Sequence, residues 1–299
     1  MRLSTQQFFI QNLTNVQQSN ANVFKYQQQL STGKKLSKPS DDPLAATQIN
    51  KFERLIARNE VFSRNVDVAE RRLKLQESTL TLVVDSLQKI KELSVQANNG
   101  ALSNTDLNII GTELNQLLGQ LAGAVNTQDA QGEYLFSGFK GQTQPYKLNA
   151  SDNYVFQGDA GQRFLNVGEN TTIASTDSGA GMFGTGEENL LNTVKQMAEA
   201  LTGNPPSIGA FNGQLDALNG FFEQTITTRS QIGARLKVLE DQREQLADIK
   251  LFTQNTLSRF KDTDYYEAAS KLALEQNALE ATYLTFSKIQ ELNLFNFIR

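Results

Sequence analysis

The sequence contains no cysteine, no histidine and no tryptophan among its 299 residues. Without cysteine and histidine there is no disulfide, no thiolate nucleophile, no imidazole base and none of the commonest ligands of transition metals. Hydroxyl side chains are plentiful, but a conventional nucleophile and base pair lacks its histidine. We therefore expect no catalytic residues, no metal site and no cofactor, and most hydrolase and metalloenzyme functions are excluded.

Long apolar runs and a strong net charge are missing as well. No stretch of about 20 residues is apolar enough for a membrane span, so we expect none. The first residues do not combine a charged lead with an apolar core, so we also expect no cleaved signal peptide. The net charge of −4 gives no reason to expect a nucleic acid or an anionic membrane as a partner.

What the sequence does contain is helical periodicity. Only 39% of the residues are hydrophobic, and they follow alternating spacings of three and four, which is typical of long helices that each bury one seam. Two members of the first seam, Asn20 and Gln27, are polar, and such positions fix register at a cost in stability. We expect this helix to form stably only against a partner. The seam comprises Phe9, Leu13, Val16, Asn20, Val23, Gln27 and Leu30.

A break between two helices occupies residues 30–46. Gly33 can take the left-handed geometry that ends a helix, and Pro39 prevents its continuation. Ser40, Asp41 and Asp42 then offer oxygens to the first amides of the next helix, and Pro43 suits its first turn. We interpret the two aspartates as helix caps rather than as a catalytic pair.

Beyond the break the spacing predicts a helix over residues 44–98, about 80 Å long. A third helix begins near Ser103 and Asp106, and its short connection favours an antiparallel neighbour. Residues 133–186 switch to the alternation of strands, visible in 146–148 and 154–156, which predicts a small β domain inserted at the tip of the helical rod. Helical periodicity then resumes, with a second rod predicted from Phe211 onwards.

The last helix is predicted to start at Asp264, which has capping-box spacing to Glu267. Its seam comprises Ala268, Leu272, Leu279, Tyr283, Phe286 and Ile289, and an apolar end follows it. The sequence therefore predicts a mainly α fold of long antiparallel rods in a coiled-coil bundle, with paired N- and C-terminal helices. The expected domains are 1–42 with 262–299, 43–132 with 187–261, and the β insert 133–186. We expect residues 1–30 and 264–299 to be poorly ordered in the monomer and to fold together on assembly.

Several motifs carry a resemblance to a known family. They are Met1–Gln6, Leu30–Lys35, Pro39–Ser40–Asp41–Asp42–Pro43, Gly132–Gly138, Phe156–Asp159, Asp262–Ala268 with Asp264 and Tyr265, and Asn293–Phe297. In these motifs the chain resembles the flagellin superfamily, at both ends and in the centre and in the same order. The Pro-Ser-Asp-Asp-Pro form is similar to members at the junction between hook and filament.

The resemblance implies a structural subunit of the bacterial flagellum that joins the hook-side junction protein to the flagellin filament and assembles through its terminal helices. It implies as partners copies of the chain itself, the hook-side junction protein, flagellin and a cytoplasmic export chaperone. It also implies an extracellular location, reached through the flagellar type III export channel without a cleaved signal. Flagellin itself is the main alternative, and a secreted needle-tip or adhesin-like coiled coil and an enzyme are the others.

Two motifs that suggest ligand sites fail on spacing. Residues 32–35 lack the earlier glycine and the strand of a phosphate-binding loop. Residues 177–188 are acidic and rich in glycine, but their oxygens do not follow the order of a calcium loop.

Overall fold

The computed structural model describes residues 2–295, and the side chains of residue 7 and of residues 9–288. Contacts divide the chain into two compact units: a terminal unit of residues 1–58 with 248–299, and a central unit of residues 59–247. Two long helices, α2 (Pro43–Ala97) and α7 (Leu215–Lys261), have residues in both units. The three-part division expected from the sequence stays a prediction.

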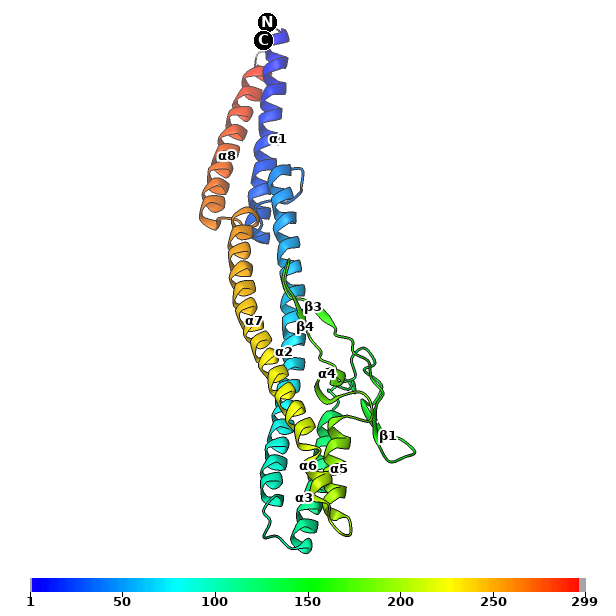
Figure 1. Cartoon of the computed structure of the whole chain (residues 1–299). Helices are drawn as coiled ribbons and strands as arrows, with labels where there is room; N and C mark the ends of the chain where they lie inside the picture. The colour runs from blue at the N-terminus through cyan, green and yellow to red at the C-terminus, as the bar shows by residue number, and fades with distance from the viewer. Residues whose placement is uncertain (1, 296–299) are drawn as a thin grey trace. The chain divides into compact units, whose positions relative to one another are not determined.

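The terminal unit pairs the two ends of the chain. Helix α1 (Arg2–Thr32) and helix α8 (Tyr265–Phe295) lie side by side (Figure 1). The beginning of α2 and the end of α7 also contact each other here: Phe52 and Phe260 stack with centroids 5.9 Å apart, and Lys261 Nζ lies 2.7 Å from Glu53 Oε1. The pairing of N- and C-terminal helices predicted from the sequence is confirmed.

The central unit is a helical bundle with most of the buried apolar side chains. Helix α3 (Asn104–Val125) packs against α5 (Leu190–Thr202), and the short α6 (Ile208–Asn212) packs against α5. Leu73, Leu80 and Leu87 of α2 are completely buried, and their spacing of seven residues is that of a heptad seam. A helix of 55 residues with this seam is about 80 Å long, so α2 is the predicted rod.

Two polar members of the α2 seam are buried with hydrogen-bond partners. Asn59 Nδ2 donates to Leu246 O of α7 at 3.0 Å, and Gln76 Nε2 donates to Leu135 O at 3.4 Å. A buried amide that finds its acceptor in only one register costs free energy in every other register. These two residues therefore fix how α7 and the chain after α3 lie along α2.

The predicted second rod is interrupted. The apolar spacing predicts a single helix from Phe211 onwards. In the structure α6 ends at Asn212 and α7 begins at Leu215. The Gly213 N–H donates to Gly209 O at 3.1 Å, which closes α6 with a turn. Phe211 of α6 and Leu218 of α7 are both buried. The apolar spacing therefore continues across the break, and the sequence pattern does not reveal it.

The β insert consists of two separate hairpins. The strands predicted at residues 146–148 and 154–156 are confirmed as β1 (Tyr146–Leu148) and β2 (Tyr154–Phe156), and they pair antiparallel with Lys147 opposite Val155. Strands β3 (Phe164–Asn166) and β4 (Thr172–Ala174) pair with Leu165 opposite Ile173, and the short helix α4 (Gly179–Phe183) follows.

The predicted position of the insert at the tip of the rod is wrong. The insert lies along the sides of α2 and α7 (Figure 1), where Asn65 Nδ2 donates to Asn166 O at 2.7 Å and Arg235 Nη1 donates to Ala174 O at 3.0 Å. The turn between α2 and α3 occupies the end of the central unit instead. The change from helical to strand periodicity predicted which residues form the insert. It did not predict which side of the helices the insert packs against.

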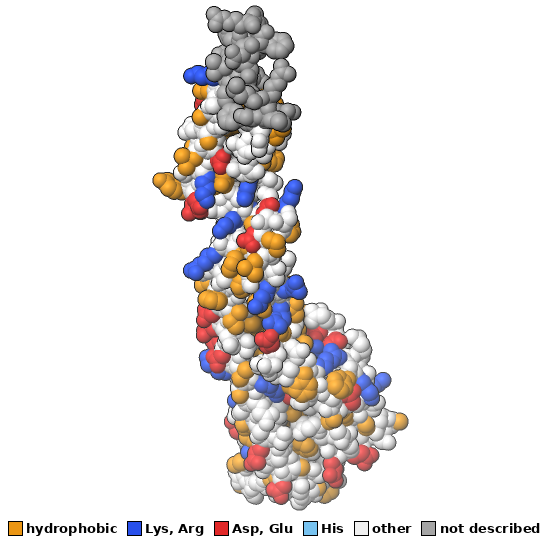
Figure 2. Space-filling model, turned by 90° about the horizontal axis from the view of Figure 1, so that it is seen from above, with side chains coloured by type: hydrophobic (Ala, Val, Ile, Leu, Met, Phe, Trp, Pro, Cys, Tyr) orange, Lys and Arg blue, Asp and Glu red, His pale blue; other side chains and the backbone are white. Residues whose placement is uncertain are grey.

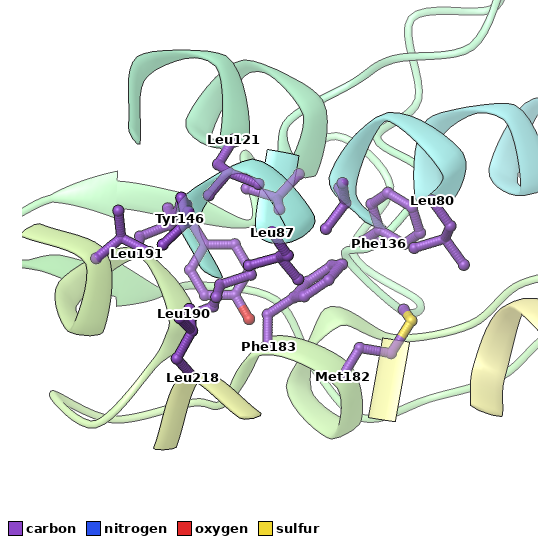
Figure 3. Packing of buried hydrophobic residues seen from close by; sticks show 14 of the residues in the cluster. Leu80, Leu87, Leu121, Phe136, Tyr146, Met182, Phe183, Leu190, Leu191 and Leu218 are labelled. Atoms are coloured by element: carbon purple, nitrogen blue, oxygen red, sulfur yellow. The ribbon is translucent and has the colours of Figure 1, made fainter. Parts of the chain in front are cut away.

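Buried aromatic side chains of the insert belong to one apolar cluster with residues of the bundle such as Leu80 and Leu87 of α2 (Figure 3). Phe183 of α4 contacts Phe136 edge to face with centroids 5.6 Å apart, and Tyr146 at 6.3 Å. The Tyr146 hydroxyl has two carbonyl acceptors within hydrogen-bond distance, Gly184 O at 2.6 Å and Gly179 O at 3.0 Å. Burial raises the pKa of the Tyr146 hydroxyl far above its usual value, so it stays a donor.

A charged cluster also links the insert to α2. Arg72 Nη1 lies 3.0 Å from Glu133 Oε2, and Arg163 Nη1 lies 2.7 Å from the same oxygen. The hydrogen bond from Arg72, with the further help of Arg163, lowers the pKa of Glu133 below its ordinary value of 4.5 despite partial burial.

This pKa shift predicts a pH dependence of stability. A carboxyl group with a lowered folded-state pKa stabilises the fold above about pH 4.5, and the contribution is lost as the pH falls through the folded-state value. We expect Glu133→Gln to lower the melting temperature of the central unit at neutral pH and to flatten its decline between about pH 5 and pH 3. The exposed Glu223 gives a matched control, and equal melting curves for Glu133→Gln and Glu223→Gln would contradict the prediction.

Candidate assembly site

The seam between α1 and α8 contains both apolar and amide contacts. Phe9 and Phe286 face each other with ring centroids 5.3 Å apart. In the same pair of helices, Asn20 Nδ2 of α1 donates to the Tyr283 hydroxyl of α8 at 3.3 Å. The seam position that sequence analysis identified as polar therefore meets a polar group on the opposite helix, which favours this register over others.

The seam is incompletely buried. Phe9 is 42% exposed, Leu13 is 43% exposed and Tyr283 is 49% exposed. Val16, Val23, Leu30, Leu272, Leu279 and Phe286 are half-buried, and the side chain of Ile289 lies outside the described residues. Ala268 is the exception among the described residues of the last seam, because it is buried. The nine described positions predicted for assembly all keep part of their side chain exposed, and their role in assembly stays a prediction.

Further apolar side chains of the terminal helices are exposed outside the seam. Phe24 is 68% exposed, Leu274 65% and Leu284 61%. Figure 2 shows hydrophobic side chains on the visible surface of these helices. The residues Gln276, Leu279, Glu280, Tyr283, Leu284 and Ser287 of α8 line a mainly apolar groove. In other proteins, large contiguous patches of exposed apolar side chains mark sites of interaction with a partner.

The two breaks of the chain are joined by main-chain hydrogen bonds. The Lys35 N–H donates to Lys261 O at 2.8 Å, and the Thr263 N–H donates to Gly33 O at 2.9 Å. The Gln29 side chain, which is buried, donates through Nε2 to Lys35 O at 2.6 Å. The end of α1 and the start of α8 are thereby fixed to each other. Both breaks are visible in the sequence. The hydrogen bonds between them could not be predicted, because they join main-chain atoms, which every residue type has.

Two of the acidic residues at the breaks act as helix caps. Asp42 Oδ1 accepts from Ala45 N at 2.9 Å at the start of α2, and Asp264 Oδ1 accepts from Glu267 N at 3.1 Å at the start of α8, as predicted. The prediction that Asp41 also caps α2 is wrong, because its Oδ2 accepts from Lys38 N at 3.0 Å and closes the preceding turn. Pro39 and Ser40 lie in the exposed turn between α1 and α2.

A cleft of about 490 Å³ opens beside the joined breaks. Lys35, Asp41, Asp262, Asp264 and Lys271 contribute charges of both signs to its lining. Polar and apolar groups line this cleft about equally, in contrast to the mainly apolar groove on α8. The terminal unit therefore offers two chemically different surfaces to partners.

Gly33 is the most constrained position of the break. Its φ is +68°, and a Cβ at this residue would lie 2.8 Å from the Tyr265 hydroxyl. We expect Gly33→Ala to weaken assembly onto filament seeds by about tenfold to a hundredfold, because left-handed strain costs about 1–3 kcal/mol. Sedimentation with seeds measures the effect.

Two further variants test the cause of that effect. Gly33→Ala combined with Tyr265→Phe should recover only part of the loss, because the strain in φ remains after the clash is relieved. Gly233→Ala is the control, since a Cβ there meets no atom within 4 Å in the helix α7. Unchanged binding of Gly33→Ala would show that the joined breaks do not matter for assembly.

Two absences bear on other functions. Within the described residues no group of acidic side chains could hold a metal ion. In the same part of the chain no helix is long and apolar enough to cross a membrane.

Comparison with known proteins gives the family. The model of the bacterial flagellin N-terminal helical region matches residues 3–141, and that of the bacterial flagellin C-terminal helical region matches residues 215–298. The chain belongs to the bacterial flagellin family. The two matches enclose the joined breaks and the paired terminal helices, so the site described above is built from the flagellin regions.

Individual relatives match over the whole length. Flagellar hook-associated protein 3 of Escherichia coli is 28% identical, with 99% of each chain covered, and that of Salmonella typhimurium is 28% identical, with 100% of each covered. A solved structure of flagellar hook-associated protein 3 from Legionella pneumophila has a TM-score of 0.64 and 21% identity, and the match covers 71% of this chain and 98% of that one. The structural likeness supports the fold within the flagellin family.

Proposed function

We propose that this chain is the structural subunit of the bacterial flagellum that joins the hook-side junction protein to the flagellin filament. The observation that carries the proposal is the match to flagellar hook-associated protein 3 over the full length, from the first helix to the last. Its role is structural rather than enzymatic. The alternative is flagellin itself, which shares the terminal helical regions.

The proposed mechanism is completion of a half-buried seam. In the described part of α1 and α8 the seam side chains stay partly exposed, and additional apolar groups face solvent. Neighbouring copies of the chain, the hook-side junction protein and flagellin would cover these groups on assembly. Burial at about 25 cal/mol per Å² would then supply the free energy that a two-helix seam lacks.

Export supplies the remaining partner in the proposal. The chain leaves the cell without a cleaved signal and is held beforehand by a cytoplasmic export chaperone. The apolar groove on α8 supports this part, because a helix face with spaced apolar anchors is what a chaperone groove binds. The proposed final location is extracellular, in the flagellum.

Hydrogen exchange of the isolated monomer tests the mechanism. We expect the amides of residues 9–30 and 264–288 to exchange faster than those of α2 within the central unit, because few buried contacts hold the terminal helices closed. Addition of filament seeds should slow their exchange. Strong protection of residues 9–30 in the monomer would contradict assembly by folding of the ends.

Sedimentation and electron microscopy under filament-promoting salt test the assignment itself. A junction subunit should bind short flagellin seeds and then stop, because it joins two unlike structures. Long filaments grown from this protein alone would identify it as a flagellin and overturn the junction assignment.

A further inference from the structure

The sequence contains three Asn-Gly pairs, and all lie in the central unit: Asn99-Gly100, Asn212-Gly213 and Asn219-Gly220. In such a pair the main-chain nitrogen of glycine can attack the side-chain carbonyl carbon of asparagine, because glycine has no Cβ to obstruct the approach. The ring closure also requires an accessible main-chain N–H and freedom of the backbone to leave a helical conformation. The structure gives the three pairs very different environments.

Asn99-Gly100 lies in the exposed turn between α2 and α3. Among the described residues, the Gly100 N–H has no hydrogen-bond partner, and a Cβ on Gly100 would meet no atom within 4 Å. Asn99 Oδ1 accepts from Ala101 N at 3.2 Å, so the side chain already folds back towards the main chain that follows it. The Leu102 N–H donates to Asn99 O at 3.1 Å and holds the turn, but the attacking Gly100 nitrogen takes no part in these hydrogen bonds.

Asn212-Gly213 lies in a more restrained turn at the end of α6. The Gly213 N–H donates to Gly209 O at 3.1 Å, and the backbone of Gly213 is helical, with φ −59° and ψ −18°. The Asn212 side chain is also engaged, because its Nδ2 donates to Asn98 Oδ1 at 2.8 Å. Both reacting groups of this pair are therefore occupied.

Asn219-Gly220 lies within the helix α7. Inside an α-helix the N–H of each residue is bonded to the carbonyl four residues earlier, so the Gly220 nitrogen is held away from the Asn219 side chain. Reaction there requires the helix to open locally. The pair is an internal control of identical sequence.

We propose that Asn99 is a site of spontaneous deamidation in the folded protein. The Gly100 nitrogen bonds to Asn99 Cγ and loses its proton to solvent, while Nδ2 takes up a proton from solvent and leaves as ammonia when the bond from Cγ to Nδ2 breaks. The resulting succinimide takes up one water, which opens it at either carbonyl to give aspartate or isoaspartate. The net reaction is the hydrolysis of an amide to a carboxylate and ammonia, with water as the co-reactant and no change of oxidation state.

The product changes a specific place in the fold. A new negative charge appears just after the carboxyl end of α2, where the helix dipole disfavours it. The adjacent Asn98 accepts the hydrogen bond from Asn212, so the modification lies next to the contact between the α2–α3 turn and α6. The isoaspartyl product also lengthens the main chain in this turn.

Peptide mapping by tandem mass spectrometry tests the proposal on the full chain after incubation at mildly alkaline pH. We expect conversion of Asn99 to exceed that of Asn219 by more than about tenfold, which corresponds to about 1.4 kcal/mol of local opening. Conversion at Asn212 should also be slower than at Asn99. In denaturant all three pairs should react at similar rates, because only the fold distinguishes them.

A single variant tests the chemistry. Gly100→Ala adds a methyl group that the folded turn accommodates, since Gly100 does not have a positive φ and its surroundings are open. We expect an unchanged melting temperature and strongly reduced conversion at Asn99. Conversion at Asn219 equal to that at Asn99 in the folded chain, or unchanged conversion in Gly100→Ala, would overturn the proposal.

Discussion

Replacing Phe183 by alanine is expected to lower the free energy of unfolding of the central unit by about 3–5 kcal/mol. Phe183 is completely buried and touches both Phe136 and Tyr146, which come from different segments of the insert. Its removal leaves a cavity beside the rings of Phe136 and Tyr146 and also loosens α4, which carries it. Denaturation in urea, followed by circular dichroism, measures the loss.

Phe164 provides the matched control for this prediction. It is also a phenylalanine of the insert, but it is 62% exposed. We expect Phe164→Ala to change the free energy of unfolding by less than about 0.5 kcal/mol. If both variants lost the same stability, the aromatic cluster would not be what binds the insert to the bundle.

The double replacement Leu279→Asp and Phe286→Asp is expected to abolish assembly onto filament seeds and binding to the proposed export chaperone. Phe286 contacts Phe9 across the seam, and Leu279 lines the apolar groove. Carboxylates at these positions would have to be buried without partners in either complex. We expect binding to weaken by at least about a hundredfold, or about 2.7 kcal/mol.

The control places the same two charges elsewhere on α8. Asn277 and Thr285 are exposed, so Asn277→Asp with Thr285→Asp alters the net charge equally without touching the seam. We expect this variant to assemble and bind normally, and both variants to retain the melting temperature of the central unit. Unchanged chaperone affinity of the first variant would place the chaperone site elsewhere, and unchanged assembly would exclude the seam.

The sequence predicted those features that depend on periodicity and on capping chemistry. The helical span of α2, the strands at residues 146–148 and 154–156 and the caps at Asp42 and Asp264 all follow local rules, and the structure has them. The break at Gly213 was not predicted, because the apolar spacing continues through it. The position of the insert was predicted wrongly, because it depends on contacts between residues far apart in the sequence, such as Arg235 and Ala174.

The same distinction applies to the assembly site. The spacing of apolar residues predicted a seam on each terminal helix, and the structure brings Phe9 and Phe286 together there, while the assembly role of the other positions stays a prediction. Asn20 could be identified as a polar member of the seam. Its partner Tyr283 could not be assigned, because register between two separate helices depends on the long-range fold. Asn22, whose Nδ2 donates to Glu275 Oε1 at 3.0 Å, was missed because it lies beside the predicted seam. An amide facing a carboxylate on paired helices is the signal that could have found it.

The hydrogen bonds between the two breaks make the chain ends mutually dependent. Gly33 and Lys35 are bonded to Thr263 and Lys261, so any displacement of one terminal helix at its base is transmitted to the other. Folding of the two ends is then a single cooperative event, since the entropy of closing the loop between them is lost only once. A subunit truncated at either end would lose the order of both, and a growing assembly would reject it as a whole rather than accept it with one defective helix.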